Sequence, residues 1–193
     1  MLILMLEFSK YGFPWILFLR LDGTDSTAKN GRVGRDSKIR NAVKILNPIS
    51  EELSLMRTFL APSMLMNAVR NIRRGNDEGR QFETANVYAP RNTAASEQPK
   101  ESKHVVLGVW GGKNDFFDMK GAVERIAEVF HVEFTYERAE KSYLHPGVSA
   151  NVIYNKQIVG VIGELDPAIA LSLGLDKKVY LGELDLSALE SAL

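Results

Sequence analysis

The sequence predicts an α+β domain in which helices pack against an antiparallel β-sheet. Several β-rich stretches are interleaved with only two or three segments of helical periodicity, and two of these stretches are close enough to form a tight hairpin. Of the 193 residues, 45% are hydrophobic and 25% are charged, as in an ordinary globular protein. A chain of this length buries roughly 70% of its unfolded surface, which is enough for one substantial core.

The N-terminal segment, residues 1–38, is predicted to stand apart from this core. Residues 1–22 are apolar, but Glu7, Lys10, Gly12 and Pro14 interrupt the run that a spanning helix needs. We therefore favour a pair of core strands, or a start peculiar to this chain, over a membrane segment. Residues 22–38 are rich in glycine and polar side chains, which predicts a flexible linker before a core domain at residues 39–193.

The first helix is expected to begin at Pro62, because proline fits the first helical turn. Gly75, which follows two arginines, is expected to end it. The apolar residues between them recur at helical spacing: Leu65, Ala68, Val69 and Ile72. Strands are expected next at residues 81–88 and 104–110. A polar stretch at residues 90–103 lies between them.

The second half predicts one long helix and four further strands. Asp118 is the expected N-cap of a helix that runs to Phe130. Strands are expected at residues 132–137, 148–154 and 157–165, the last two joined by a turn at Asn155 and Lys156. A short helix from Asp166-Pro167 to Gly174 and a strand at 178–186 complete the pattern.

Charge and cysteine content narrow the classes of function. Lys+Arg and Asp+Glu each number 24, so no net charge draws the chain to nucleic acid over long range. The sequence has no cysteine, which excludes disulfides, thiolate zinc sites and cysteine nucleophiles.

Three blocks, in their order and spacing, carry a family resemblance. They are NPISEELSLMRTFLAPSMLMNAVRNIRRGNDEGRQFETANVY at 47–88, DFFDMKGAVERIAEVF at 115–130, and YLHPGVSANVIYNKQIVGVIGELDP at 143–167. Together they resemble the catalytic-like core module of the β subunit of bacterial phenylalanyl-tRNA synthetase.

The resemblance implies a class II aminoacyl-tRNA synthetase-like antiparallel sheet with flanking helices, in a fragment of a cytoplasmic ligase subunit. In that family the α subunit binds phenylalanine, ATP and magnesium, while the β core packs on the α subunit and helps to support tRNA. This chain is expected to bind no cofactor or metal itself and to have no membrane role.

A working class II site needs an arginine at the end of its motif 2 strand and another in its motif 3 glycine-rich turn, because a triphosphate requires fixed positive charge. Here Ala89 and Pro90 follow Tyr88, and Arg91 lies beyond the proline. No Gly-x-Gly turn or arginine follows Asp185. We therefore expect no catalytic residue and no adenylation by this chain alone.

Two groups of residues are candidates for binding. Asn47 and Pro48 resemble the motif 1 entry through which class II domains pair, and Met64 and Met66 lie off the main apolar stripe of their helix, as exposed interface residues would. Arg70, Arg73 and Arg74 form the only short basic cluster. Contact with the tRNA backbone and a solvated helix face explain this cluster equally well.

The remaining polar motifs favour structural roles. A single arginine such as Arg57 more often pairs with a carboxylate than binds substrate. His145, Pro146 and Gly147 suit a loop that enters a strand. His104 and His131 have no metal-site spacing, and Glu183 and Asp185 alternate with leucines as on a half-solvated strand.

Residues 108–113, GVWGGK, match a phosphate-binding loop only weakly and fit a strand followed by a turn better. A different class of function stays open: a free-standing synthetase-derived module that binds protein or RNA outside translation.

Overall fold

The computed structural model describes residues 42–48, 55–91 and 98–190. The predictions for residues 1–38, including the flexible linker, lie outside these ranges. Within them, no helix is long and apolar enough to cross a membrane.

Ten helices and strands follow one another along the described part of the chain, and all six strands belong to one antiparallel sheet with the order β1-β2-β6-β5-β4-β3. This confirms the predicted fold class. The elements are α4 (Ala61–Arg73), β1 (Gly79–Ala89), β2 (Lys100–Trp110), α5 (Phe116–Phe130), β3 (Thr135–Arg138), β4 (Leu144–Tyr154), β5 (Gln157–Leu165), α6 (Pro167–Ser172), β6 (Val179–Asp185) and α7 (Leu186–Glu190).

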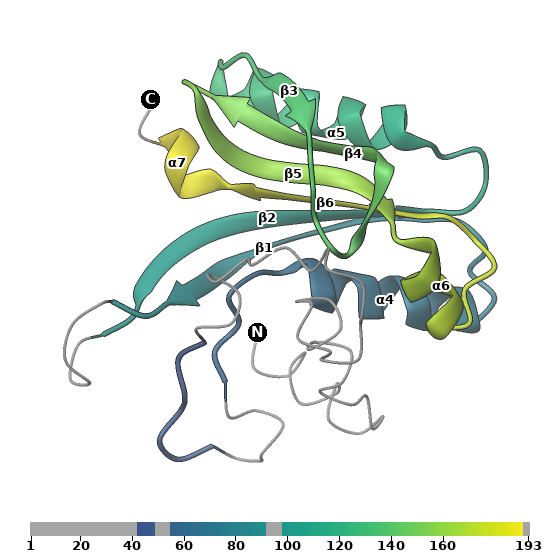
Figure 1. Cartoon of the computed structure of the whole chain (residues 1–193), viewed down its shortest axis with the longest axis horizontal. Helices are drawn as coiled ribbons and strands as arrows, with labels where there is room; N and C mark the ends of the chain where they lie inside the picture. Colours follow the sequence, from purple (N-terminus) through teal and green to yellow (C-terminus); the bar gives the residue numbers. More distant parts are fainter. Residues whose placement is uncertain (1–41, 49–54, 92–97, 191–193) are drawn as a thin grey trace.

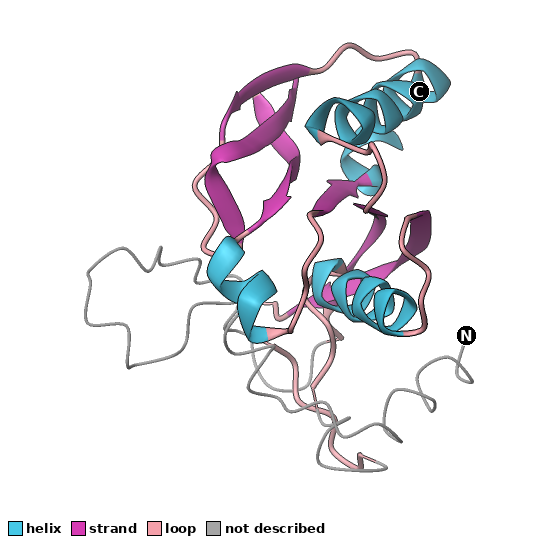
Figure 2. Cartoon of the chain, turned by 90° about the vertical axis from the view of Figure 1, so that its right-hand side faces the viewer, coloured by secondary structure: helices cyan, strands magenta, loops and turns pink. Residues whose placement is uncertain are grey.

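Helices cover both faces of the sheet. In Figure 1, α4 and α6 lie below the central strands and α5 lies above them. The view turned by 90° shows strands between the two groups of helices (Figure 2). Each side has its own core: one contains Leu65 and Val69 of α4 with Leu181 of β6, and the other contains Val123 of α5 with Ile162 of β5.

The two long helices approach the sheet in the same way. A Cβ on Gly108 of β2 would lie 2.7 Å from Sδ of Met64, and a Cβ on Gly182 of β6 would lie 2.9 Å from Sδ of Met119. A strand glycine therefore makes room for a buried methionine under each helix, because any larger residue would collide with the thioether.

Turns and helix ends follow the residues predicted for them. Asn155 and Lys156 turn the β4–β5 hairpin with φ of 48° and 63°, the left-handed conformation that a tight hairpin requires. Asp166 caps α6 by accepting from the N–H of Ala168 at 2.8 Å. Gly75, at φ 86°, ends α4 as expected.

Several predicted boundaries were wrong. The N-cap of α5 is Asp115, and Asp118 is its third helical residue, because the two aspartates form a reciprocal capping box. The helix α7 was missed, and β2 begins at Lys100 inside the stretch predicted as a polar separator. In the predicted strand at 132–137, only residues from Thr135 onward pair with a neighbour.

Candidate functional site

The C-terminal ends of β1 and β6 flank the same part of β2. Asn86 pairs with Lys103 of β2, and the next β2 residue, His104, pairs with Asp185 of β6. The N–H of Lys103 donates to Oγ of Ser187, at the start of α7, at 2.9 Å. The two strand ends at which a class II enzyme needs its arginines therefore lie on either side of β2.

Glu183 of β6 is the central residue of this region. Its side chain is 8% exposed, and Oε2 accepts hydrogen bonds from the backbone N–H groups of Leu60 and Ala61, both at 2.9 Å. These donors belong to the first turn of α4, whose N-cap residue Leu60 provides no side-chain acceptor. A carboxylate from a distant strand thus caps the helix and complements the positive end of its dipole.

His104 joins Glu183 to a second carboxylate. Its Nδ1 lies 2.7 Å from Oε1 of Glu183, and its Nε2 lies 3.9 Å from Oδ2 of Asp185. The alternation of Glu183 and Asp185 with leucines predicted a solvated strand face for both carboxylates. That is wrong for Glu183, because the face it shares with the neighbouring strands is covered by α4.

A missing cap was the signal that could have revealed this contact. Phe59, Leu60 and Ala61 precede Pro62, and none of them can accept a hydrogen bond through its side chain. A buried helix start of this kind needs an acceptor from elsewhere in the fold. The sequence alone does not say which of 24 acidic residues supplies it.

Arg57 lies beside this end of β1, and its side chain is already engaged. Nε of Arg57 donates to the carbonyl of Asn86 at 2.9 Å, and Nη1 lies 3.3 Å from Oε1 of Glu83. The carbonyl of Arg57 also accepts from the N–H of Tyr88 at 2.9 Å. Arg57 therefore fastens the entry to α4 onto the outer edge of β1, the structural role expected for it.

The two methionines proposed as interface residues are not exposed. Met64 is 1% and Met66 is 8% exposed. Met64 belongs to the same core cluster as Leu60 and Leu65, so the expected apolar surface on α4 is wrong. The helix is buried over more of its circumference than one stripe because it packs on the middle of the sheet.

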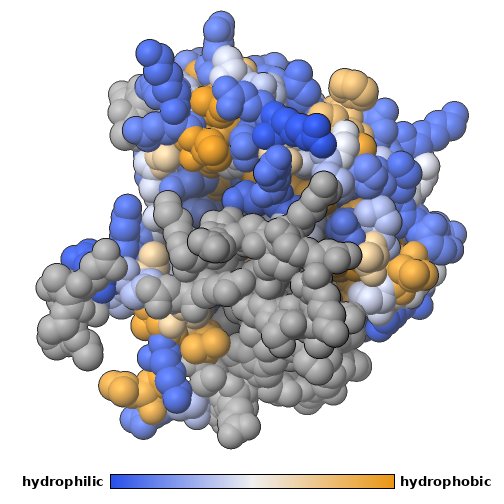
Figure 3. Space-filling view, viewed as in Figure 1, coloured by the Kyte–Doolittle hydropathy of each residue, from blue (hydrophilic) through white to orange (hydrophobic). Residues whose placement is uncertain are grey.

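Exposed apolar residues instead lie beside Asn47 and Pro48, which are themselves exposed. Leu46 is 96%, Ile45 38% and Leu55 36% exposed. Lys44 forms a bridge with Leu55, which brings the two described segments together. Apolar side chains gather over this part of the chain at the lower left of Figure 3.

The basic cluster at the end of α4 divides into two kinds of residue. Arg73 donates from Nη2 to the carbonyl of Leu173 at 3.0 Å and so ties α4 to the end of α6. Arg70 is half-buried, whereas Arg74 is exposed. Neither the tRNA-contact hypothesis nor the solvated-face hypothesis is tested by these contacts.

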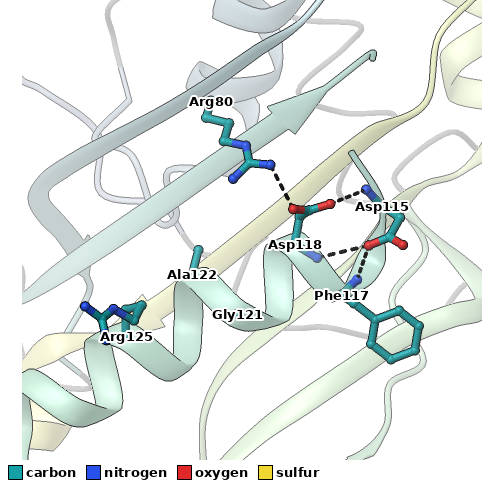
Figure 4. Close-up of a pocket in the computed structure, with 7 residues that line it drawn as sticks. All are labelled: Arg80, Asp115, Phe117, Asp118, Gly121, Ala122 and Arg125. Carbon is teal, nitrogen blue, oxygen red and sulfur yellow. Dashed lines mark hydrogen bonds and ion pairs between the residues drawn. The ribbon is translucent and has the colours of Figure 1, made fainter. Parts of the chain in front are cut away.

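A shallow hollow lies between β1 and the first turns of α5 (Figure 4). Nη2 of Arg80 donates to Oδ1 of Asp118 at 2.8 Å and to Oδ1 of Asn114 at 2.6 Å. A hydrogen bond with the backbone of Asp115, followed by the attraction of Arg80, lowers the pKa of Asp118 below its ordinary value of 3.8. The other two charged residues of the hollow are also engaged, because Asp115 caps α5 and Arg125 pairs with Glu128.

The other histidines and the glycine-rich stretch serve local structure. His145 accepts from the N–H of Gly147 at 3.0 Å through Nδ1. It lies inside β4, where the pairing register shifts, so the predicted loop before the strand is a bulged part of the strand itself. His131 ends α5 at φ 54°, and Gly111 and Gly112 form the turn after β2. Among the described residues, no group of three histidine or acidic side chains could hold a metal ion.

The family model described as phenylalanyl tRNA synthetase beta chain CLM domain matches residues 24–186. The phenylalanine–tRNA ligase beta subunit of Clostridium acetobutylicum is 35% identical over 159 residues, covering 81% of this chain and 20% of the relative. Those of Clostridium tetani and Staphylococcus aureus are 36% identical over 159 residues and 34% over 163 residues. The chain spans about a fifth of the length of each of these relatives.

Among solved structures, pyrrolysyl-tRNA synthetase from Desulfitobacterium hafniense has a similar fold, with a TM-score of 0.58 and 12% sequence identity. The match covers 79% of this chain and 53% of that one. At this identity the likeness concerns the fold alone.

Proposed function

Because the chain belongs to the phenylalanyl-tRNA synthetase β-chain family, we propose that it is the non-catalytic core module of a phenylalanine–tRNA ligase. In this role it packs on the α subunit and supports aminoacylation of tRNA there, while ATP and magnesium bind to the α subunit. The module is taken to begin at residue 39, a boundary that stays a prediction.

The buried Glu183 is the observation that carries the non-catalytic part of the proposal. A nucleotide site at the ends of β1 and β6, on either side of β2, would need arginines that face the triphosphate. The chain has instead a carboxylate bonded to the start of α4 and to His104, with Asp185 beside them. A phosphate group placed there would meet the like charges of Glu183 and Asp185. The guanidinium of Arg57 is already paired with Glu83.

Direct titration tests this absence of nucleotide binding. Calorimetry with ATP and Mg²⁺ added to the full 193-residue chain should give no saturable heat up to ~1 mM ATP, the upper end of ordinary enzyme affinities. Saturable binding that Glu183→Gln alters would place a nucleotide at this site and contradict the proposal.

The segment around Asn47 and Pro48 supports an interface with the α subunit. Leu46 is almost fully exposed beside them, and Ile45 and Leu55 add apolar surface. Grouped apolar residues of this kind are typical of protein–protein contacts. Charge substitution at Met66, by contrast, would damage the fold, because that side chain is buried.

Co-elution with the cognate α subunit tests the partner and the surface together. The wild-type chain should co-elute on size exclusion, and Leu46→Asp should weaken the complex by at least tenfold. Leu171→Asp is the matched control, because Leu171 is 80% exposed on α6, away from this segment. A chain that never co-elutes would favour the free-standing interaction module, and equal binding by both variants would refute the surface.

A further inference from the structure

The strand β1 forms one edge of the sheet and is unusually long for an edge strand. It has 11 residues, whereas β3 at the opposite edge has four. The outer side of an edge strand presents backbone N–H and C=O groups that another strand can pair with. Long edges are therefore either guarded or used for association.

The contacts of Arg57 show which residues of β1 point their backbone groups outward. The N–H of Tyr88 and the C=O of Asn86 both bond to Arg57, on the side away from β2. The β1–β2 register runs without a shift from Gly79 to Ala89. Backbone direction alternates along a strand, so the N–H and C=O groups of Arg80, Phe82 and Thr84 also point outward.

These three residues have no outer neighbour in the part of the chain that the structure describes, since no backbone hydrogen bond beyond the β2 ladder involves them. The free edge is therefore residues 80–84, directly beside the part that Arg57 covers. Phe82, at its centre, is 74% exposed.

The charged residues of this free edge are paired within their own chain. Arg80 is bonded to Asn114 and Asp118, and Glu83 is bonded to Arg57. Natural edge strands are usually protected by free lysines, prolines or bulges. Here an exposed aromatic residue lies where such a protective residue would be expected.

We propose that a second copy of this chain pairs with the free edge, β1 against β1 and antiparallel, about a two-fold axis at Phe82. This interface goes beyond the proposed function and does not depend on it. The register places Phe82 opposite its own copy and Arg80 opposite Thr84, which gives about six backbone hydrogen bonds, two at each of three residue pairs.

The self-pairing register is complementary in charge as well as in hydrogen bonding. On the opposite face it sets Gln81 against Glu83 and so opposes no like charges. One step further along, Asn86 of the second copy lies opposite Glu78, which is exposed. Arg57 of the second copy donates a hydrogen bond to the carbonyl of its own Asn86. The pairing therefore brings this arginine close to Glu78 of the first copy. A two-fold interface requires this self-complementarity, and it favours a second copy over a strand of another protein.

The interface is small, so association should be weak and depend on concentration. Sedimentation equilibrium of the full chain should show a monomer–dimer equilibrium, with dimer present at ~1 mM chain. Thr84→Pro removes only an outward N–H and leaves the β2 ladder intact, and it should weaken dimerisation at least tenfold. Thr84→Val keeps that N–H and should dimerise like the wild type. Circular dichroism must show both variants folded.

Cross-linking tests the register itself. The chain has no cysteine, so Phe82→Cys introduces a single thiol. Residues that face each other in a hydrogen-bonded pair have Cα atoms about 5.5 Å apart, so a short bis-maleimide should join two copies efficiently. Ile158→Cys is the control, because Ile158 is 65% exposed at the start of β5.

Three outcomes would overturn the proposal. They are a wild-type chain that stays monomeric at ~1 mM, a dimer that Thr84→Pro leaves unchanged, and cross-linking of Ile158→Cys equal to that of Phe82→Cys. A monomer that binds an added strand peptide at this edge would assign the edge to a different partner.

Discussion

The starts of the two long helices solve one problem by opposite means. In α5, Asp115 and Asp118 satisfy the first N–H groups from within the same turn, and the reciprocal capping box is closed by neighbours in sequence. In α4, the acceptor is Glu183, which lies 123 residues along the chain from Leu60. The start of α5 is therefore capped by residues of its own first turn, whereas the start of α4 is capped only when β6 is in place.

This difference separates local stability from cooperative stability. Losing a local cap weakens one helix end, which can recover part of its hydrogen bonding from water. Losing Glu183 leaves buried donors unsatisfied where two sheet strands and a helix meet. Under the proposed function the same carboxylate lies where a ligase would need positive charge, so the contact that stabilises α4 is also expected to disfavour a bound triphosphate.

Glu183→Ala should have the largest effect of the substitutions that probe this comparison. It leaves two buried N–H groups and His104 without their acceptor, and we expect a loss of about 3 kcal/mol in the free energy of unfolding. Glu183→Gln keeps one acceptor oxygen and should recover more than half of that loss. Urea denaturation measures both values, and a loss under about 1 kcal/mol for the alanine variant would deny Glu183 a capping role.

Asp115→Ala should cost less, about 1 kcal/mol, the usual value for an exposed N-cap. Asp115→Ser supplies another acceptor and serves as the matched control, with a change of a few tenths of a kcal/mol. The same denaturation experiment applies. A loss as large as that of Glu183→Ala would show that the distinction between local and distant caps is unfounded.

The smallest effect concerns the acid response of the local cap. The pKa of Asp118 is lowered in the folded chain, chiefly by its bond to the backbone of Asp115 and next by Arg80. Ionised Asp118 therefore stabilises the fold above its unfolded pKa, and this contribution is lost as the pH falls through the folded value. Asp118→Asn should therefore lower the free energy of unfolding slightly near pH 7 and flatten its decline below about pH 4, so that the variant and the wild type converge in acid. An unchanged acid limb would contradict this assignment.

The elements that could be predicted from the sequence are those that depend on residues close together in the chain. The turn at Asn155 and Lys156, the cap at Asp166 and the end of α4 at Gly75 were predictable because each depends on residues close in sequence. The capping residue of α5 was misplaced by three positions, since both aspartates suit the role. The pairing of β6 between β2 and β5 was not predictable, because strand order depends on long-range packing.

The candidate site was harder to predict than the fold. The missing arginines could be read directly from the residues after Tyr88 and Asp185. The roles of Met64 and Glu183 could not, because both depend on how far α4 sinks onto the sheet, with Gly108 making room for the methionine. The spacing of apolar residues in the sequence identifies one buried stripe along α4. It does not show that the helix is buried over more of its surface than that stripe.

Phenylalanine-dependent ATP–pyrophosphate exchange is the most direct test of the central claim. That claim is that the contacts of Glu183 with His104 and the start of α4 stabilise the fold and are not part of a catalytic site. The full chain alone should give exchange equal to that of a blank without protein. Its complex with the cognate α subunit should give exchange above that blank. Exchange by the isolated chain above the blank, abolished when ATP or phenylalanine is omitted, would contradict the account.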